Sequence, residues 1–144
     1  MSRFVRRAVA VGVAAVAAAG GATVPAAATT QFAVDHFRVC MDEATNDCST
    51  RVEGSITWGQ RTAIVTGKVI NGEGGSATAA FSAYAGSKRI DHTTRTASGV
   101  STTPFSFVIG DPNLVGGINR ISETMGVFTG QLVVPGDSKV DIRD

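Results

Sequence analysis

The chain is poor in aromatic residues, histidine and cysteine, and it has no large surplus of charge of either sign. Aromatic side chains make up 6% of the sequence, and there are one Trp, one Tyr, two His and two Cys residues. The formal net charge of +1 disfavours a nucleic-acid binder, which needs a basic surface. A charged fraction of 17% and 17 Gly residues exclude a long coiled coil. A length of 144 residues allows one domain.

The start of the chain has the organisation of a secretory signal peptide. Three arginines lie among the first seven residues, and residues 8–24 form an apolar run of Ala, Val and Gly with one Thr. Small residues at Ala26 and Ala28 suit the exit site of a signal peptidase, so we expect cleavage after Ala28. Residues 1–28 are therefore predicted to be a cleavable signal peptide, and residues 29–144 the mature domain.

Two alternatives concern the export route and the fate of this leader. The pair Arg6 and Arg7 leaves open a twin-arginine signal, although the bulky apolar continuation of such signals is missing. A retained membrane anchor is disfavoured because Ala and Gly match the bilayer core less well than Leu and Ile. Cleavage removes three of the 13 basic residues and none of the 12 acidic ones, so the 116 remaining residues carry −2. We therefore expect a secreted, extracellular protein with no nucleic-acid partner and no membrane contact after cleavage.

The two cysteines lie in the part that would face an oxidising exterior. Cys40 and Cys48 are the only pair available, so we expect them to form a disulfide. A loop this short contributes about 2.5 kcal/mol in the chain-entropy treatment. A redox or zinc role would need closer spacing or more ligands, and no cofactor is expected.

Short alternating runs separated by turn residues predict strands and no sustained helix. The fold expected is all-β, an antiparallel two-sheet sandwich of immunoglobulin-like or jelly-roll-like type. A turn is expected at 135–137, and a short final strand or tail at 139–142. The other predicted strands cover residues 32–41, 52–58, 61–70, 76–85, 89–97, 103–109, 114–122 and 125–134.

Catalytic motifs are missing. There is no Gly-x-Ser-x-Gly elbow for a serine hydrolase. Glu53, Glu73 and Glu123 are not expected to be buried, so the paired carboxylates of a glycosidase are not indicated. His36 and His92 would form a candidate metal site only if their strands were neighbours. A small hydrolase using either histidine is the least favoured function.

Binding suits the pattern better than catalysis. The Thr-rich run around Arg95 offers polar strand surface, and Trp58 and Tyr84 are aromatics with a polar atom. We take Trp58, Tyr84 and Arg95 as candidate ligand-binding residues, with Trp58 more typical of a core. The main hypothesis is a secreted, non-catalytic binding module for an extracellular protein or carbohydrate.

An inhibitor of secreted hydrolases is the alternative. Its reactive loop would be the apolar, Gly-containing stretch Leu114–Asn119 or the loop closed by the disulfide. The same stretch also fits a strand with a Gly bulge.

The Ala/Val/Gly leader and three short strings carry a resemblance. The strings are residues 54–59 (GSITWG), 94–97 (TRTA) and 116–121 (GGINRI). With them the sequence resembles small secreted β-rich proteins of unknown function from streptomycete-type actinobacteria. The subtilisin-inhibitor group and the neocarzinostatin-type carriers are of similar size but use two disulfides, whereas this chain can form one. No site residue is carried over from any of them.

Overall fold

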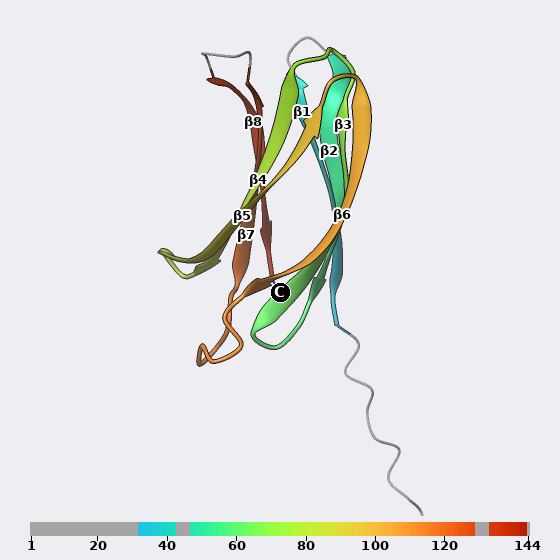
Figure 1. Ribbon diagram of the computed structural model, residues 1–144. Coiled ribbons are helices and arrows are strands. Elements are labelled where there is room, and N and C mark those ends of the chain that lie inside the picture. Colours follow the sequence, from blue (N-terminus) through green and yellow to red (C-terminus); the bar gives the residue numbers. More distant parts are fainter. Residues whose placement is uncertain (1–31, 43–46, 129–132, 144) are drawn as a thin grey trace, which may run out of the picture. The chain divides into compact units, whose positions relative to one another are not determined.

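The computed structural model describes residues 32–42, 47–128 and 133–143. The expected signal peptide, residues 1–28, lies outside the described residues, as does the tip of the loop closed by the disulfide. The described part holds eight strands, shown in Figure 1. They are β1 (Val34–Asp42), β2 (Asp47–Trp58), β3 (Thr62–Asn71), β4 (Ser76–Ala85), β5 (Lys88–Ser98), β6 (Ser101–Gly110), β7 (Arg120–Phe128) and β8 (Val133–Ile142).

The strands form two four-stranded antiparallel sheets, and the predicted all-β, two-sheet architecture is confirmed. The first sheet has the order β1-β2-β3-β6 and the second the order β5-β4-β7-β8. The sheets form two layers of a sandwich-like arrangement (Figure 1). Phe81 of the second sheet contacts Phe37 and Phe105 of the first, edge to face, at centroid distances of 5.8 and 5.4 Å.

Alternation along each strand explains which residues enter the core, since successive side chains point to opposite faces. In β4 the buried positions are Ala77, Ala79, Phe81 and Ala83. Three alanines and one large ring therefore make the inner surface of β4, and rings from β1 and β6 fill the space. The other sheet contributes Val52, Ile56, Trp58, Val65, Val69 and Ile109, among others.

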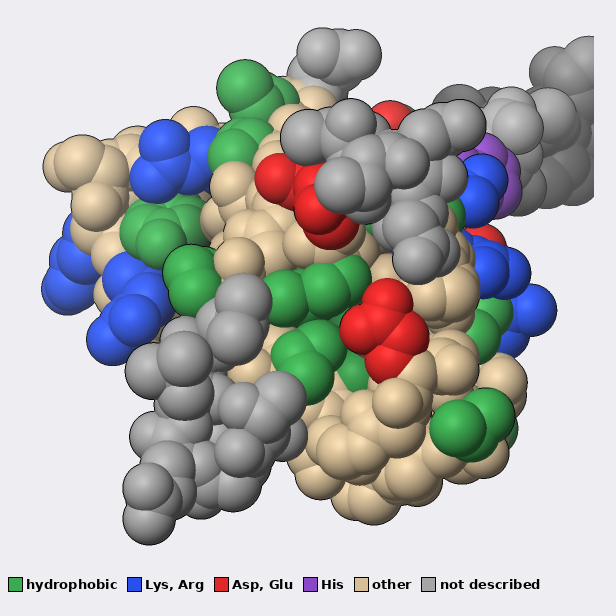
Figure 2. Space-filling view, turned by 90° about the horizontal axis from the view of Figure 1, so that it is seen from above, with side chains coloured by type: hydrophobic (Ala, Val, Ile, Leu, Met, Phe, Trp, Pro, Cys, Tyr) green, Lys and Arg blue, Asp and Glu red, His purple; other side chains and the backbone are tan. Residues whose placement is uncertain are grey.

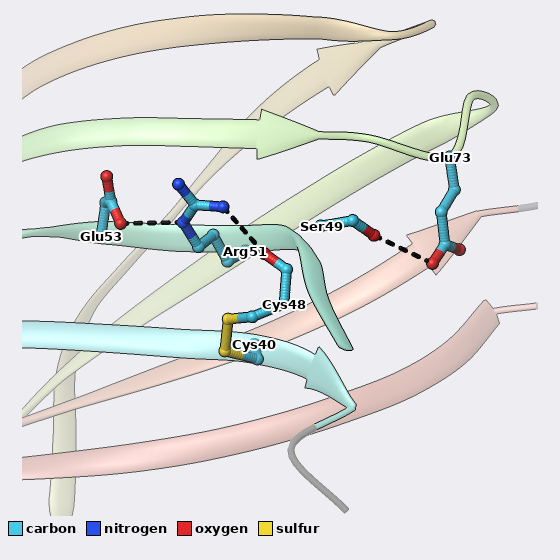
Figure 3. Close-up of a disulfide and its surroundings, with 6 residues drawn as sticks. All are labelled: Cys40, Cys48, Ser49, Arg51, Glu53 and Glu73. Atoms are coloured by element: carbon cyan, nitrogen blue, oxygen red, sulfur yellow. Dashed lines mark hydrogen bonds and ion pairs between the residues drawn. A yellow bond between two sulfur atoms is a disulfide. The ribbon is translucent and has the colours of Figure 1, made fainter. Parts of the chain in front are cut away.

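The predicted disulfide is confirmed. Cys40 on β1 and Cys48 on β2 are bonded, with their Cα atoms 5.0 Å apart. Beside it, the Arg51 guanidinium donates to the Cys48 carbonyl at 2.8 Å and to the Glu53 carboxylate at 2.9 Å (Figure 3). The bridge therefore ties β1 to β2 next to the loop that joins them.

The last two strands differ from the prediction. Residues 114–119 form a loop, and β7 runs through residues 122–125, where the sequence suggested a break. The break was expected at Glu123, but Glu123 lies on the inner face between the buried Ile121 and Met125. The expected turn at Pro135 lies inside β8, next to a register irregularity. An edge strand accepts proline because one side of it needs no ladder hydrogen bond.

Candidate functional site

The outer face of the second sheet carries small and hydroxyl-bearing side chains. β4, one of its two inner strands, contributes Thr78, Ala80 and Ser82, which are only partly buried. The register places Thr96 and Gly126 on either side of Thr78, and Thr94 and Thr124 on either side of Ala80. Few of these side chains are large enough to cover the sheet, so the backbone lies close to the surface here.

A hollow of about 360 Å³ lies on this face. It is lined by Thr78, Ala80, Thr124, Met125, Gly126, Val127 and Pro135. It forms here because Ala80 and Gly126 have small side chains or none. Pro135 on β8 lines its side, next to the register irregularity between Thr124 and Gly126. None of the lining residues is charged, so the hollow suits an uncharged group.

Tyr84 and Arg120 are register partners further along the same face. The guanidinium carbon of Arg120 lies 4.3 Å from the centroid of the Tyr84 ring. Such a cation–π contact stabilises the pair by about 0.5–1 kcal/mol at an exposed position. Of the predicted binding residues, Tyr84 is therefore the one placed on the face that also carries the hollow.

Trp58 and Arg95 are placed elsewhere. Trp58 is 1% exposed, and its indole N–H donates to the Asp35 carboxylate. Arg95 stacks on the Phe107 ring at 4.3 Å and donates to the Thr93 hydroxyl at 2.8 Å. Both side chains hold the sandwich together, so neither joins Tyr84 in one site.

The two histidines are not brought together. His36 is exposed on β1 of the first sheet and His92 on β5 of the second, and these strands are not neighbours. The condition for a shared metal site is therefore not met. Within residues 32–42, 47–128 and 133–143, no group of three or more His, Cys, Asp or Glu side chains is arranged to hold a metal ion.

Ser82 and His92 form a serine–histidine pair on the outer face. The Ser82 hydroxyl lies 3.0 Å from Nδ1 of His92. A hydrolase also needs an acid on the imidazole and donors for an oxyanion. The neighbouring Asp91 instead accepts the backbone N–H groups of His92 and Gly110. The pair is thus a cross-strand hydrogen bond between β4 and the edge strand β5.

The loop at residues 111–119 ends in a tight turn. The N–H of Gly117 donates to the Leu114 carbonyl at 3.1 Å, and Gly116 has φ +82°, as at the third position of a type II turn. Val115 therefore stands at the corner of the turn and is 90% exposed. Position 117 requires glycine for two reasons. Its φ is +68°, and a Cβ atom there would lie 2.5 Å from the Gln60 carbonyl oxygen.

Two arginines and a buried isoleucine hold this loop in place. The Arg61 guanidinium donates to the Pro112 carbonyl, and that of Arg143 to the carbonyls of Gly59, Gln60 and Gly116. Ile118 is fully buried, and its N–H donates to the Arg61 carbonyl. In Figure 1 this loop, the β2–β3 hairpin and the C-terminus lie together at the lower end.

The opposite end shows mixed polarity. Figure 2 looks onto the end with the β3–β4 and β5–β6 turns, where hydrophobic side chains reach the surface near the middle. Acidic side chains lie beside them, while Lys and Arg are divided between two sides. The basic residues visible here do not form a single patch.

Sequence reasoning missed one buried carboxylic acid. Glu123 is 0% exposed, and neither of its carboxyl oxygens has a hydrogen-bond partner among the described residues. Burial and the nearby Asp141 carboxylate raise the pKa of Glu123 to about 8. The signal was its place in the alternation of Ile121, Met125 and Val127, all of which point inward.

Comparisons with known proteins give no relative. No protein-family model, no curated protein and no solved structure matches this chain. Among the described residues, no helix is long and apolar enough to span a membrane.

Proposed function

We propose that this protein is an exported, non-catalytic binding module whose ligand face is the outer face of the second sheet. The observation that carries the proposal is the hollow of about 360 Å³ in a surface of methyl and hydroxyl groups. Ligand pockets in proteins usually measure about 300–1,000 Å³ and are largely apolar with a few polar groups. Export is supported by the leader pattern and is consistent with the disulfide.

An uncharged carbohydrate is the ligand class that this face suits best. The methyl groups of Ala80 and Thr78 match the C–H face of a sugar ring, and the hydroxyls of Thr124 and Ser122 offer hydrogen bonds to its polar edge. The pair of Tyr84 and Arg120 extends the face beyond the hollow. An extracellular protein with a small apolar projection is the other partner class.

Hydrolysis and inhibition have less support. The Ser82–His92 pair has no acid on its imidazole among the described residues. A protease inhibitor needs a loop that enters the enzyme as an extended strand. The loop at Val115 is instead closed by the hydrogen bond between Gly117 and Leu114.

We infer that the sandwich is of the immunoglobulin-like rather than the jelly-roll-like subtype. After β3 the chain crosses to the second sheet, makes the β4–β5 hairpin, and returns as β6 beside β3. Greek-key crossings of this kind join the two sheets of immunoglobulin-like domains.

A pair of matched variants tests the ligand face. Ala80→Leu fills the hollow, whereas Thr66→Leu places the same side chain on the outer face of the first sheet. We would titrate the protein with uncharged oligosaccharides of glucose, xylose and N-acetylglucosamine and follow backbone amide shifts by NMR. We expect shifts around the hollow that Ala80→Leu abolishes and Thr66→Leu retains. Shifts confined to the first sheet, or equal binding by both variants, would rule out this face.

Export is tested separately. Mass spectrometry of culture supernatant should give a chain that begins near Thr29. A full-length species found only in the membrane fraction would contradict export.

A further inference from the structure

The edge strand β8 presents its charged residues to the inside of the sandwich. The register pairs Lys139 with Glu123 and Asp141 with Ile121, so Lys139 and Asp141 share the inner face. The apolar residues between and beyond them, Val140 and Ile142, point outward and are 50% and 62% exposed. The polarity of this part of β8 is therefore opposite to that of β4, where Ala79, Phe81 and Ala83 face inward.

These charges meet β1 along one open side of the sandwich. β1 is an edge strand of the first sheet and β8 is an edge strand of the second. The two edge strands are in contact. The Lys139 ammonium lies 2.9 Å from one Asp141 oxygen and donates to the His36 carbonyl of β1 at 2.7 Å. Asp35 of β1, which accepts the Trp58 indole N–H, adds a third carboxyl group whose charge acts on Glu123.

The charges in this seam do not balance. The charges that act on Glu123 are those of two carboxylates, Asp35 and Asp141, and of one cation, Lys139. The inner face of β4 beside Glu123 is Ala79, Phe81 and Ala83, and the buried side chains of β2 are uncharged, so neither strand supplies a cation. Both oxygens of Glu123 and one of Asp141 are buried without a partner among the described residues. A third negative charge here would therefore be uncompensated, which is costly in a low-dielectric interior.

We propose that the seam between β1 and β8 is a proton-operated latch, which is closed while Glu123 holds its proton and which releases β8 when that proton is lost. The raised pKa of Glu123 agrees with this geometry, because it keeps the carboxyl neutral through the acidic range and up to about pH 8. In an opened seam Glu123 is hydrated and ionises near its ordinary pKa of 4.5. Between these two values each unit of pH should therefore favour the open form tenfold, since opening releases one proton.

The latch would also act on the proposed ligand face. Pro135, one wall of the hollow, belongs to β8, so release of β8 would dismantle the hollow. This consequence rests on the proposed binding function, whereas the latch does not. The experiment below uses no ligand, so it can fail or succeed independently of binding.

Hydrogen exchange of individual amides tests the latch in the wild-type protein. We expect the opening constant of β8, corrected for intrinsic exchange, to rise about tenfold per pH unit between about pH 5 and 8 and then to level off. Amides of β2 and β3 should exchange more slowly than those of β8 at every pH, because they are exposed only when the whole fold unfolds. Trp58, the only tryptophan of the chain, lies against Asp35 and should report the same opening by a red shift of its emission.

Two matched variants complete the test. Glu123→Gln keeps the shape of the protonated acid and should make the opening of β8 independent of pH. Glu53→Gln, which removes a carboxylate from the outer face of the first sheet, should keep the wild-type slope. A flat profile in the wild type, an equal slope in Glu123→Gln, or protection in β2 and β3 that is no greater than in β8 would each overturn the latch.

Discussion

Gly54 on β2 and Gly67 on β3 are direct register partners, and neither position has room for a Cβ atom. A Cβ on Gly54 would lie 2.2 Å from the Thr66 carbonyl oxygen and 2.9 Å from the Phe37 ring. A Cβ on Gly67 would meet the Glu53 carbonyl oxygen at 2.3 Å and the Phe105 ring at 3.0 Å. The paired glycines therefore admit two phenyl rings into the centre of the core.

Substitution of Gly67 by alanine should destabilise the fold by roughly 1–3 kcal/mol, because the backbone or the Phe105 ring has to shift. Urea unfolding measures the change. Gly74→Ala is the control, since no atom lies within 4 Å of its Cβ and only its φ of +88° is unfavourable. Equal stability of Gly67→Ala and the wild type would contradict the close approach of the Glu53 carbonyl oxygen and the Phe105 ring to position 67.

The disulfide should contribute about 2.5 kcal/mol to the free energy of unfolding, since it closes a short loop. We expect the double variant Cys40→Ala, Cys48→Ala to fold but to unfold at correspondingly lower urea concentration. Mass spectrometry should find the untreated protein 2 Da lighter than the reduced one. A protein that alkylates without prior reduction would contradict the bond.

Global stability should fall as pH rises from about 4.5 to about 8. The folded-state pKa of Glu123, about 8, lies above its unfolded value, so its stabilising effect is complete below pH 4.5 and lost by pH 8. Glu123→Gln should therefore match the wild type near pH 4.5 and exceed it at pH 7 by up to about 3 kcal/mol. Unfolding curves at the two pH values measure this difference. A variant that is less stable than the wild type at pH 7 would contradict the assignment.

Two substitutions in the loop at residues 111–119 should differ in their effect on the free energy of unfolding, because one side chain is exposed and the other is buried. Val115→Ser should change stability by no more than about 0.5 kcal/mol, because the side chain is almost fully exposed. Ile118→Ala removes a fully buried side chain three residues later and should cost about 2–4 kcal/mol. Thermal unfolding of both variants gives the comparison, and similar losses would mean that the turn packs differently.

Much of the fold follows from residue alternation. The runs that became β3 and β4 alternate between buried and exposed positions with turn residues at both ends, and their predicted ranges are close to the observed ones. The strands β7 and β8 could not be placed in the same way. A buried glutamate and a proline within a strand both contradict local preference, and each is tolerated only because of its position in the assembled sheet.

The candidate site was less accessible to sequence reasoning. Tyr84 could be selected as an aromatic with a hydroxyl group, but the hollow depends on which residues lie beside Ala80 across three strands. The pairing of β4 with β7 is a long-range contact that no local pattern encodes. The same holds for the seam, where Glu123 meets residues of β1 and β8.

The inverted polarity of β8 bears on self-association. An outer strand with free backbone groups is a template on which another chain can add a strand and start a fibre. Inward-pointing charges oppose this. A strand added to β8 would have to pack beside Lys139 and Asp141 on the inner face, where no apolar surface is offered to it. Pro135 further interrupts the donor pattern of that edge. The residues that unbalance the charge inside the sandwich thereby also keep its edge from polymerising.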